Sequence, residues 1–360
     1  MIPIAKPSIG TEEIFHVQQV LKSGNIASGQ VVSDFENDFA TYFKMPYGVA
    51  TSSGTTALHA AIIACNIKKG DKIITTPFTF AATANSLLFE GAIPIFADID
   101  PNTFNIDVNH VEELLKVHKD IKGILIVHLF GLPCNMDRIM ELVKKYNLLL
   151  IEDCAQAHGA KYNDQYVGTF GTTSAYSFYP TKNMTTGEGG MILTKDKSIY
   201  ENIQRIISHG QKERYLHTQL GYNFRMTNIA AALGIEQLNK LNDFNDKRKE
   251  NAKFYNENIK NNQITLPFVP SKCDPVYHQY TVKVKNRTSF IKHLEENNIG
   301  YGIYYPIPLN TQPYYKELGY DPTTTPIALQ ISQEVVSIPV HPLLSKEEIL
   351  KIIEVINLYE

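Results

Sequence analysis

The chain is poor in the features that mark metal-binding, membrane-spanning and nucleic-acid-binding proteins. Its four cysteines (Cys65, Cys134, Cys154 and Cys273) lie far apart and form no CxxC pair, which predicts reduced thiols and no zinc or iron–sulfur site. No segment approaches ~18 consecutive apolar residues, and the first six residues lack the apolar core of a signal peptide. The net charge of −3 gives no electrostatic basis for binding nucleic acid or membranes. We therefore predict a cytoplasmic protein without a metal site.

Apolar segments and helical patterns alternate along the first two thirds of the chain, which shows no internal repeat. From residue 47 onward this alternation predicts a mostly parallel sheet with helices on both faces. The expected strands are 47–51, 72–75, 93–96, 124–128 and 148–152, and the expected helices are 11–22, 56–64, 81–89, 111–118 and 137–146.

The 360 residues are enough for two domains with separate cores. A long helical pattern begins near Thr227 and runs into the charged stretch 243–253. We predict a hinge or boundary there. It would divide the chain into a large domain, residues 1–242, which includes the N-terminal helix, and a smaller C-terminal α+β domain, residues 243–360.

Lys182 lies between a strand-like segment, 174–178, and the glycine-rich run 187–190. A solvated loop lysine is the ordinary interpretation, but at a strand end its amine can point into a cleft. Asp153 follows the apolar segment 148–151, so it is expected at another strand end. A lysine that forms an imine and a carboxylate that pairs with a pyridinium nitrogen are what pyridoxal phosphate needs.

A carboxylate at the position of Asp153 is costly to bury without a cationic or hydrogen-bonded partner, and a pyridinium N–H is such a partner. A helix N-cap is the alternative role for this aspartate. Gln156 and His158, further along the same turn, could reach ring substituents or could simply be polar loop residues.

Gly54, Thr55 and Thr56 open an expected helix directly after the first sheet strand. Free N–H groups at such a helix start favour a phosphate, to which Ser177 could donate its hydroxyl. An ordinary Ser/Thr N-cap is the alternative. The following strand ends near Phe78 and Phe80, either of which could stack on a planar cofactor or pack in the core.

Five segments in series resemble the DegT/DnrJ/EryC1/StrS family of sugar aminotransferases, which are pyridoxal-phosphate enzymes. They are Gly54-Thr55-Thr56, 79–83, 152–160, the run from Ser177 through Lys182 to Gly190, and 221–228. The resemblance extends from Pro3 to about Leu358. A nicotinamide-binding protein is disfavoured because no GxGxxG opens a helix after the first strand.

The resemblance implies fold type I and a homodimer with shared active sites. It makes Lys182 the imine lysine, Asp153 the pyridinium partner and Phe80 the stacking aromatic, and it places Gln156 near the ring hydroxyl. The remaining roles that it implies are phosphate contacts from Gly54, Thr55, Thr56, Ser177 and the neighbouring subunit's Asn223, and substrate contacts from His209, Arg225, Tyr305 and Asn310.

The function implied is transfer of an amino group from L-glutamate to a nucleotide-linked ketosugar, for amino-sugar and surface-glycan synthesis. The glycine-rich run and segment 222–228 favour a 4-keto-6-deoxy sugar over a C3-keto sugar. Relatives with histidine at the lysine position are dehydratases, so Lys182 favours the aminotransferases. A dehydratase on the same scaffold and a non-catalytic regulatory homologue remain alternatives. Asn310 replaces the histidine that is commoner at its position.

Overall fold

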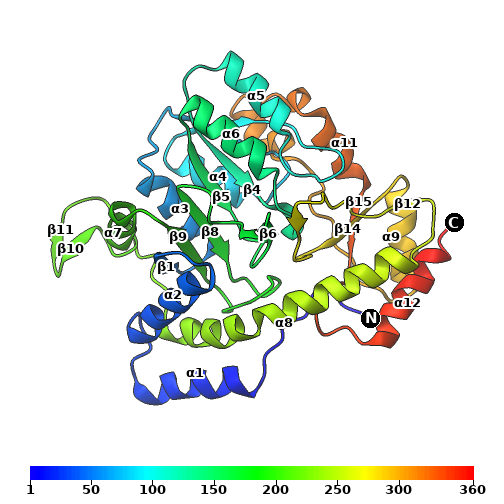
Figure 1. The fold of residues 1–360 in the computed structure, drawn as a ribbon, viewed down its shortest axis with the longest axis horizontal. Coiled ribbons are helices and arrows are strands. Elements are labelled where there is room, and N and C mark those ends of the chain that lie inside the picture. The colour runs from blue at the N-terminus through cyan, green and yellow to red at the C-terminus, as the bar shows by residue number, and fades with distance from the viewer.

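The computed structural model describes residues 1–360, and a seven-stranded sheet of order β1-β9-β8-β5-β4-β2-β3 forms its centre (Figure 1). Only β9 runs antiparallel to its neighbours, so the predicted mostly parallel sheet is confirmed. The carboxyl ends of the other strands therefore meet at one edge. The strands are β1 (Tyr47–Thr51), β2 (Lys72–Thr75), β3 (Ile93–Phe96), β4 (Ile121–Val127), β5 (Leu149–Asp153), β8 (Thr173–Ser177) and β9 (Gly190–Thr194).

Helices cover both faces of this sheet because successive strand residues point to opposite sides. Ile151 joins a core that includes α3 (Gly54–Ala64) and α7 (Lys197–Ile206), whereas its neighbour Leu150 joins the core under α6 (Met136–Tyr146) on the other face. Further helices on these faces are α4 (Ala82–Phe89), α5 (Val108–Val117) and α2 (Gln30–Tyr42), the last of which the sequence did not predict.

A smaller unit with its own core lies beside the large sheet (Figure 1). Its three-stranded antiparallel sheet has the order β12-β14-β15. The elements of this unit are β12 (Ile264–Thr265), β14 (Tyr280–Val284), β15 (Val335–Ile338), α9 (Arg287–Glu296) and α12 (Lys346–Asn357).

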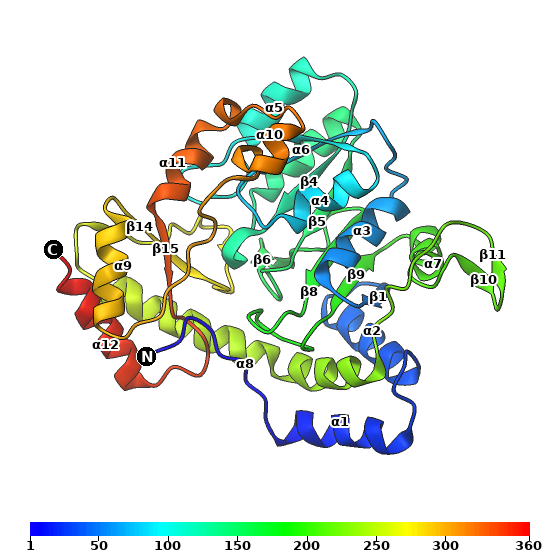
Figure 2. The same ribbon diagram turned by 180° about the vertical axis from the view of Figure 1, so that it is seen from behind.

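The helix α8 (Asn228–Asn258) runs unbroken for 31 residues along both units (Figure 2). Its Leu241 packs in the core of the large unit and its Ala252 in the core of the small one. The domain division at residue 243 stays a prediction, but that position lies inside a continuous helix, so the backbone has no break there. The charged stretch is part of this helix, which exposes most of its charged side chains and buries Asn245 and Arg248.

Segments other than α8 also connect the two units, because residues from each end of the chain pack in the core of the unit formed mainly by the other part. Ala328 and Ile331 of α11 (Pro326–Glu334) pack in the core of the large unit, although residues beyond 243 were assigned to the small domain. Asp98 accepts hydrogen bonds from the N–H groups of Ile327 and Ala328, at 2.8 Å each, and so fixes the start of this helix. Ile2, in turn, packs in the core of the small unit.

The remaining elements lie around these two units, and none of the helices could span a membrane. The hairpin of β10 and β11 projects away from the body (Figures 1 and 2). These elements are α1 (Thr11–Ser23), η1 (Leu129–Gly131), β6 (Lys161–Tyr162), β7 (Gln165–Tyr166), β10 (Gln211–Glu213), β11 (Leu216–His217), β13 (Cys273–Asp274), η2 (Leu309–Thr311), α10 (Pro313–Glu317) and η3 (Pro322–Thr324).

Candidate active site

Asp153 is the last residue of β5 and is 4% exposed at the carboxyl edge of the sheet. One carboxylate oxygen accepts a hydrogen bond from the Thr83 hydroxyl at 2.8 Å, and the other accepts one from the Ala155 N–H at 3.1 Å. Burial raises the pKa of Asp153, and these hydrogen bonds and the charge of Lys182 oppose that rise. The carboxylate is therefore buried and fixed in position by two hydrogen bonds.

Lys182 lies in the loop after β8, half-buried, with its backbone N–H bonded to the Tyr179 carbonyl at 2.8 Å. Burial lowers the pKa of its amine to about 8, while the negative charge of Asp153 works in the opposite direction. A much larger share of this amine is neutral near pH 7 than in an exposed lysine. A neutral amine is the form that attacks a carbonyl carbon.

The start of α3 is shaped as an anion site. The first N–H groups of a helix have no partner within it. A Cβ on Gly54 would lie 2.6 Å from the Cβ of Ser177, so only glycine lets the helix start approach the end of β8 this closely. Thr56 also serves the ordinary capping role, because its N–H donates to the Ser53 hydroxyl at 3.1 Å and its own hydroxyl bonds Ser53. Thr55 makes no such contact.

The aromatic residues after β2 differ sharply in exposure. Phe78 is fully buried in the main core, whereas Phe80 is 61% exposed and therefore available to a planar ligand. The Phe80 ring lies 6.4 Å from that of Tyr305, centroid to centroid. Gln156 joins this group, since its side chain accepts from the Phe130 N–H at 2.7 Å and donates to the Tyr305 hydroxyl at 3.1 Å.

His209 and Arg225, expected near the substrate, and Asn223, expected near the phosphate, are exposed on two segments that the bridge between Ser208 and Asn223 joins. The Arg225 Nε donates to the Asn223 side chain at 3.2 Å. The Ser52 N–H bonds the Phe224 carbonyl at 2.7 Å, so this segment runs beside the start of α3 in the same chain. A contribution of Asn223 to a partner's site stays a prediction.

Asn310 is fully buried and holds its own loop together. Its amide nitrogen donates to the Thr325 hydroxyl at 2.9 Å and to the Asp321 carbonyl at 3.1 Å, and its side-chain oxygen has no partner in the chain. These bonds join η2 to the segment that leads into α11. Substrate contact by Asn310 stays a prediction.

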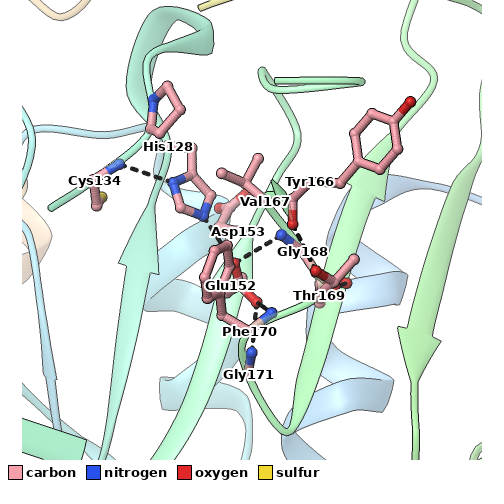
Figure 3. Close-up of polar contacts among 12 residues, drawn as sticks. His128, Cys134, Glu152, Asp153, Tyr166, Val167, Gly168, Thr169, Phe170 and Gly171 are labelled. Carbon is pink, nitrogen blue, oxygen red and sulfur yellow. Dashed lines mark hydrogen bonds and ion pairs between the residues drawn. The ribbon is translucent and has the colours of Figure 1, made fainter. Parts of the chain in front are cut away.

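Glu152, which was given no role from the sequence, forms a buried cluster with His128 behind Asp153 (Figure 3). Its oxygens accept from the N–H groups of Gly168, Phe170 and Gly171 at 2.6–2.8 Å. The Nδ1 atom of His128 accepts from the Cys134 N–H at 3.1 Å, so its Nε2 carries the proton that faces Glu152 at 3.1 Å. Neighbouring strand residues point to opposite faces, so Glu152 fixes the end of β5 from behind while Asp153 faces the site.

His128, Glu152 and Cys154 offer ligand atoms within 4.8 Å of one another. The Glu152 oxygens and both nitrogens of His128 are already used in hydrogen bonds. This geometry explains the cluster as a structural one.

Glu152→Gln should lower the free energy of unfolding by about 2–4 kcal/mol, because one end of the amide would place its NH₂ group against buried N–H donors. Urea denaturation measures this change. Glu112→Gln, at a partly exposed carboxylate paired with Lys145 and Arg138, is the matched control and should cost clearly less. Equal losses in the two variants would contradict the structural importance of the cluster.

The site fits pyridoxal phosphate in three respects. The glycine-lined helix start can receive a phosphate, Asp153 can pair with a protonated ring nitrogen, and Lys182 offers a primary amine whose pKa is lowered. β5 and β8 are neighbouring parallel strands with Asp153 opposite Ala175, so the loop of Lys182 leaves the sheet at the same edge that carries Asp153. These residues would hold the phosphate, the ring nitrogen and the aldehyde carbon of the cofactor.

Fold and site together define an amino-group transferase built on a parallel sheet. Residues 7–357 match the model of the DegT/DnrJ/EryC1/StrS aminotransferase family. The chain is 38% identical over 366 residues to a GDP-perosamine synthase of Escherichia coli O157:H7, which covers 99% of this chain and 98% of the relative. It is 40% identical over 344 residues to a dTDP-3-amino-3,6-dideoxy-alpha-D-galactopyranose transaminase of Aneurinibacillus thermoaerophilus, which covers 95% and 94%.

A solved structure is also similar to this chain. Spr1654 from Streptococcus pneumoniae, a proposed sugar aminotransferase in its PLP form, superposes with a TM-score of 0.93 at 28% identity, over 99% of this chain and 97% of that one. The chain therefore belongs to the DegT/DnrJ/EryC1/StrS aminotransferase family. The predicted resemblance, fold class and enzyme class are confirmed.

Proposed function

We propose that this enzyme uses pyridoxal phosphate to transfer an amino group from L-glutamate to a keto group on a nucleotide-linked sugar. The observation that carries the proposal is the position of Lys182, whose pKa burial lowers to about 8, at the same edge of the sheet as the buried carboxylate of Asp153. Relatives named as GDP-perosamine synthase and as a dTDP-aminodideoxygalactose transaminase support a nucleotide-sugar substrate.

When bound, pyridoxal phosphate supplies an aldehyde for amine attachment and a ring that takes up electrons. The Nζ atom of Lys182 would hold the cofactor and, once free, would move a proton from the carbon of the amino donor to the cofactor carbon to which Nζ had been attached. In the second half of the reaction the same Nζ would move a proton from that cofactor carbon to the sugar carbon. Asp153 would accept a hydrogen bond from the ring nitrogen and keep it protonated.

The surrounding residues orient the cofactor. Phe80 would lie against the ring, and Gln156, fixed by the Phe130 N–H, would face the ring hydroxyl. Gly54, Thr55, Thr56 and Ser177 would bind the phosphate. The proposal further includes a homodimer in which the partner subunit's Asn223 completes the phosphate site, with His209, Arg225, Tyr305 and Asn310 on the sugar side.

Among sugars we favour a 4-keto-6-deoxy sugar carried by a nucleoside diphosphate. Two relatives are named for sugars carried by different nucleotides, a GDP-perosamine synthase and a dTDP-3-amino-3,6-dideoxy-alpha-D-galactopyranose transaminase. The second name places an amine at C3, so both keto positions belong in the test.

The test is a panel of GDP-, dTDP- and UDP-linked 3-keto and 4-keto sugars, each incubated with the enzyme and ¹⁵N-labelled glutamate. We expect one class of ketosugar to gain the label, and NMR of the product then gives the position of the amine. Glutamate alone should bleach the visible absorbance of the lysine-bound cofactor. Loss of water without transfer of the label would instead support the dehydratase.

A further inference from the structure

We infer that Asn245 is a positioning residue that ties the loop carrying Lys182 to the loop carrying Asp153 and Gln156. Asn245 lies on α8, is 4% exposed and forms its hydrogen bonds with Asn183 and His158, neither of which is proposed to bind cofactor or substrate. The inference rests on the pairing of Lys182 with Asp153 proposed above.

The side-chain amide of Asn245 forms a hydrogen bond with each of the two loops. Its nitrogen donates to the His158 carbonyl at 2.8 Å, five residues after Asp153 in the chain. Its oxygen accepts from the side-chain nitrogen of Asn183 at 2.8 Å, and Asn183 directly follows Lys182. Both hydrogen-bonding groups of Asn245 are thus used, one for each loop.

Gly159 makes this close approach possible. It has a φ of +87°, which disfavours any side chain, and a Cβ there would lie 2.9 Å from the side-chain nitrogen of Asn245. A residue with a side chain at this position would push α8 away from the His158 carbonyl. The loop after Asp153 is therefore shaped to receive the amide.

Asn183 extends the contact to the segment before β14. Its nitrogen also donates to the Val276 carbonyl at 3.1 Å, and its oxygen accepts from the Nδ1 atom of His278 at 3.3 Å. Asn183 and His278 are 3% and 5% exposed. Buried amide contacts of this kind are costly to leave unpaired, so they hold the backbone next to Lys182 in one conformation.

By holding this loop in place, Asn245 controls how deeply the amine of Lys182 is buried. The loop of Lys182 has no regular secondary structure. It is held by local bonds, such as those from the Lys182 N–H to Tyr179 and from the Thr186 N–H to Phe178, and by the side-chain contact of Asn183 with α8. If the Asn245 contact is lost, the loop can move outward and its amine becomes more hydrated. The burial that lowers the amine's pKa would then decrease.

The test measures the amine directly in the apoenzyme by competitive labelling with fluorodinitrobenzene across pH, followed by mass spectrometry of the Lys182 peptide. In wild type the labelling midpoint should lie near pH 8. Asn245→Ala should raise it by about one pH unit and weaken pyridoxal phosphate binding about tenfold. Asn183→Ala, which removes the same contact from the other side, should act in the same direction, and the double variant should add little.

Asn251→Ala is the matched control. Asn251 lies on the same helix, is 9% exposed and donates to two backbone carbonyls, those of Val340 and His341, away from both loops. Its loss should reduce stability without moving the midpoint. An unchanged midpoint in both Asn245→Ala and Asn183→Ala would overturn the inference. The labelling is done without cofactor, so its result does not depend on whether Lys182 binds pyridoxal phosphate. Failure of Lys182 to bind the cofactor would instead refute the proposed function.

Discussion

Lys182→Ala should abolish the covalent attachment of pyridoxal phosphate and lower transamination by at least about 10³-fold. No other lysine occupies its place beside Asp153, and alanine can neither attach the cofactor nor carry a proton between carbons. Borohydride reduction followed by peptide mass spectrometry measures the attachment, and an assay of labelled glutamate measures the transfer.

Two controls separate chemistry from folding in this variant. Lys144→Ala removes an exposed lysine of α6 and should leave both measurements unchanged. Added methylamine should restore part of the activity of Lys182→Ala, because a small amine can enter the space of the lost side chain and accept the proton. Retention of the borohydride-stable cofactor on Lys182→Ala would show that a different residue attaches it.

The alternation of strands and helices predicted the sheet well because each strand is a short apolar run flanked by turns. α2 was not predicted, although Phe35 and Phe39 mark its buried face, because it begins after Gly29 without a side-chain N-cap to indicate a helix start. The break expected near residue 243 followed from a run of charges. Those charges lie on one continuous helix whose buried face changes partner between Leu241 and Ala252.

The site could be predicted from the sequence where the cofactor requires a particular type of side chain at a particular place. A lysine and an aspartate at strand ends pointed to the cofactor, and the family pattern chose Phe80 over Phe78, the residue that the structure buries in the core. Contacts that depend on tertiary structure were not predictable. Asn245 lies about sixty residues from Asn183, and nothing in its local sequence indicates that its amide meets that loop.

Asp153→Asn should lower transamination by about 10²–10³-fold, the usual effect of losing one preorganised electrostatic contact. An asparagine has nearly the same shape, and its oxygen can still accept from the Ala155 N–H, so the fold should survive. The neutral amide cannot keep the ring nitrogen protonated, and the ring then takes up electrons poorly. Steady-state rates with glutamate and the ketosugar measure the effect.

The same variant has a second consequence that requires neither cofactor nor substrate. The charge of Asp153 stabilises the protonated amine of Lys182, which raises its pKa against the effect of burial. Removing that charge should therefore move the pKa of Lys182 below its value of about 8, the direction opposite to that expected for Asn245→Ala. Competitive labelling of the apoenzyme measures the shift, with Asp107→Asn, an N-cap of α5 far along the chain, as control. An unchanged Lys182 midpoint in Asp153→Asn would mean that the two groups do not interact, and the proposed pairing would fail with it.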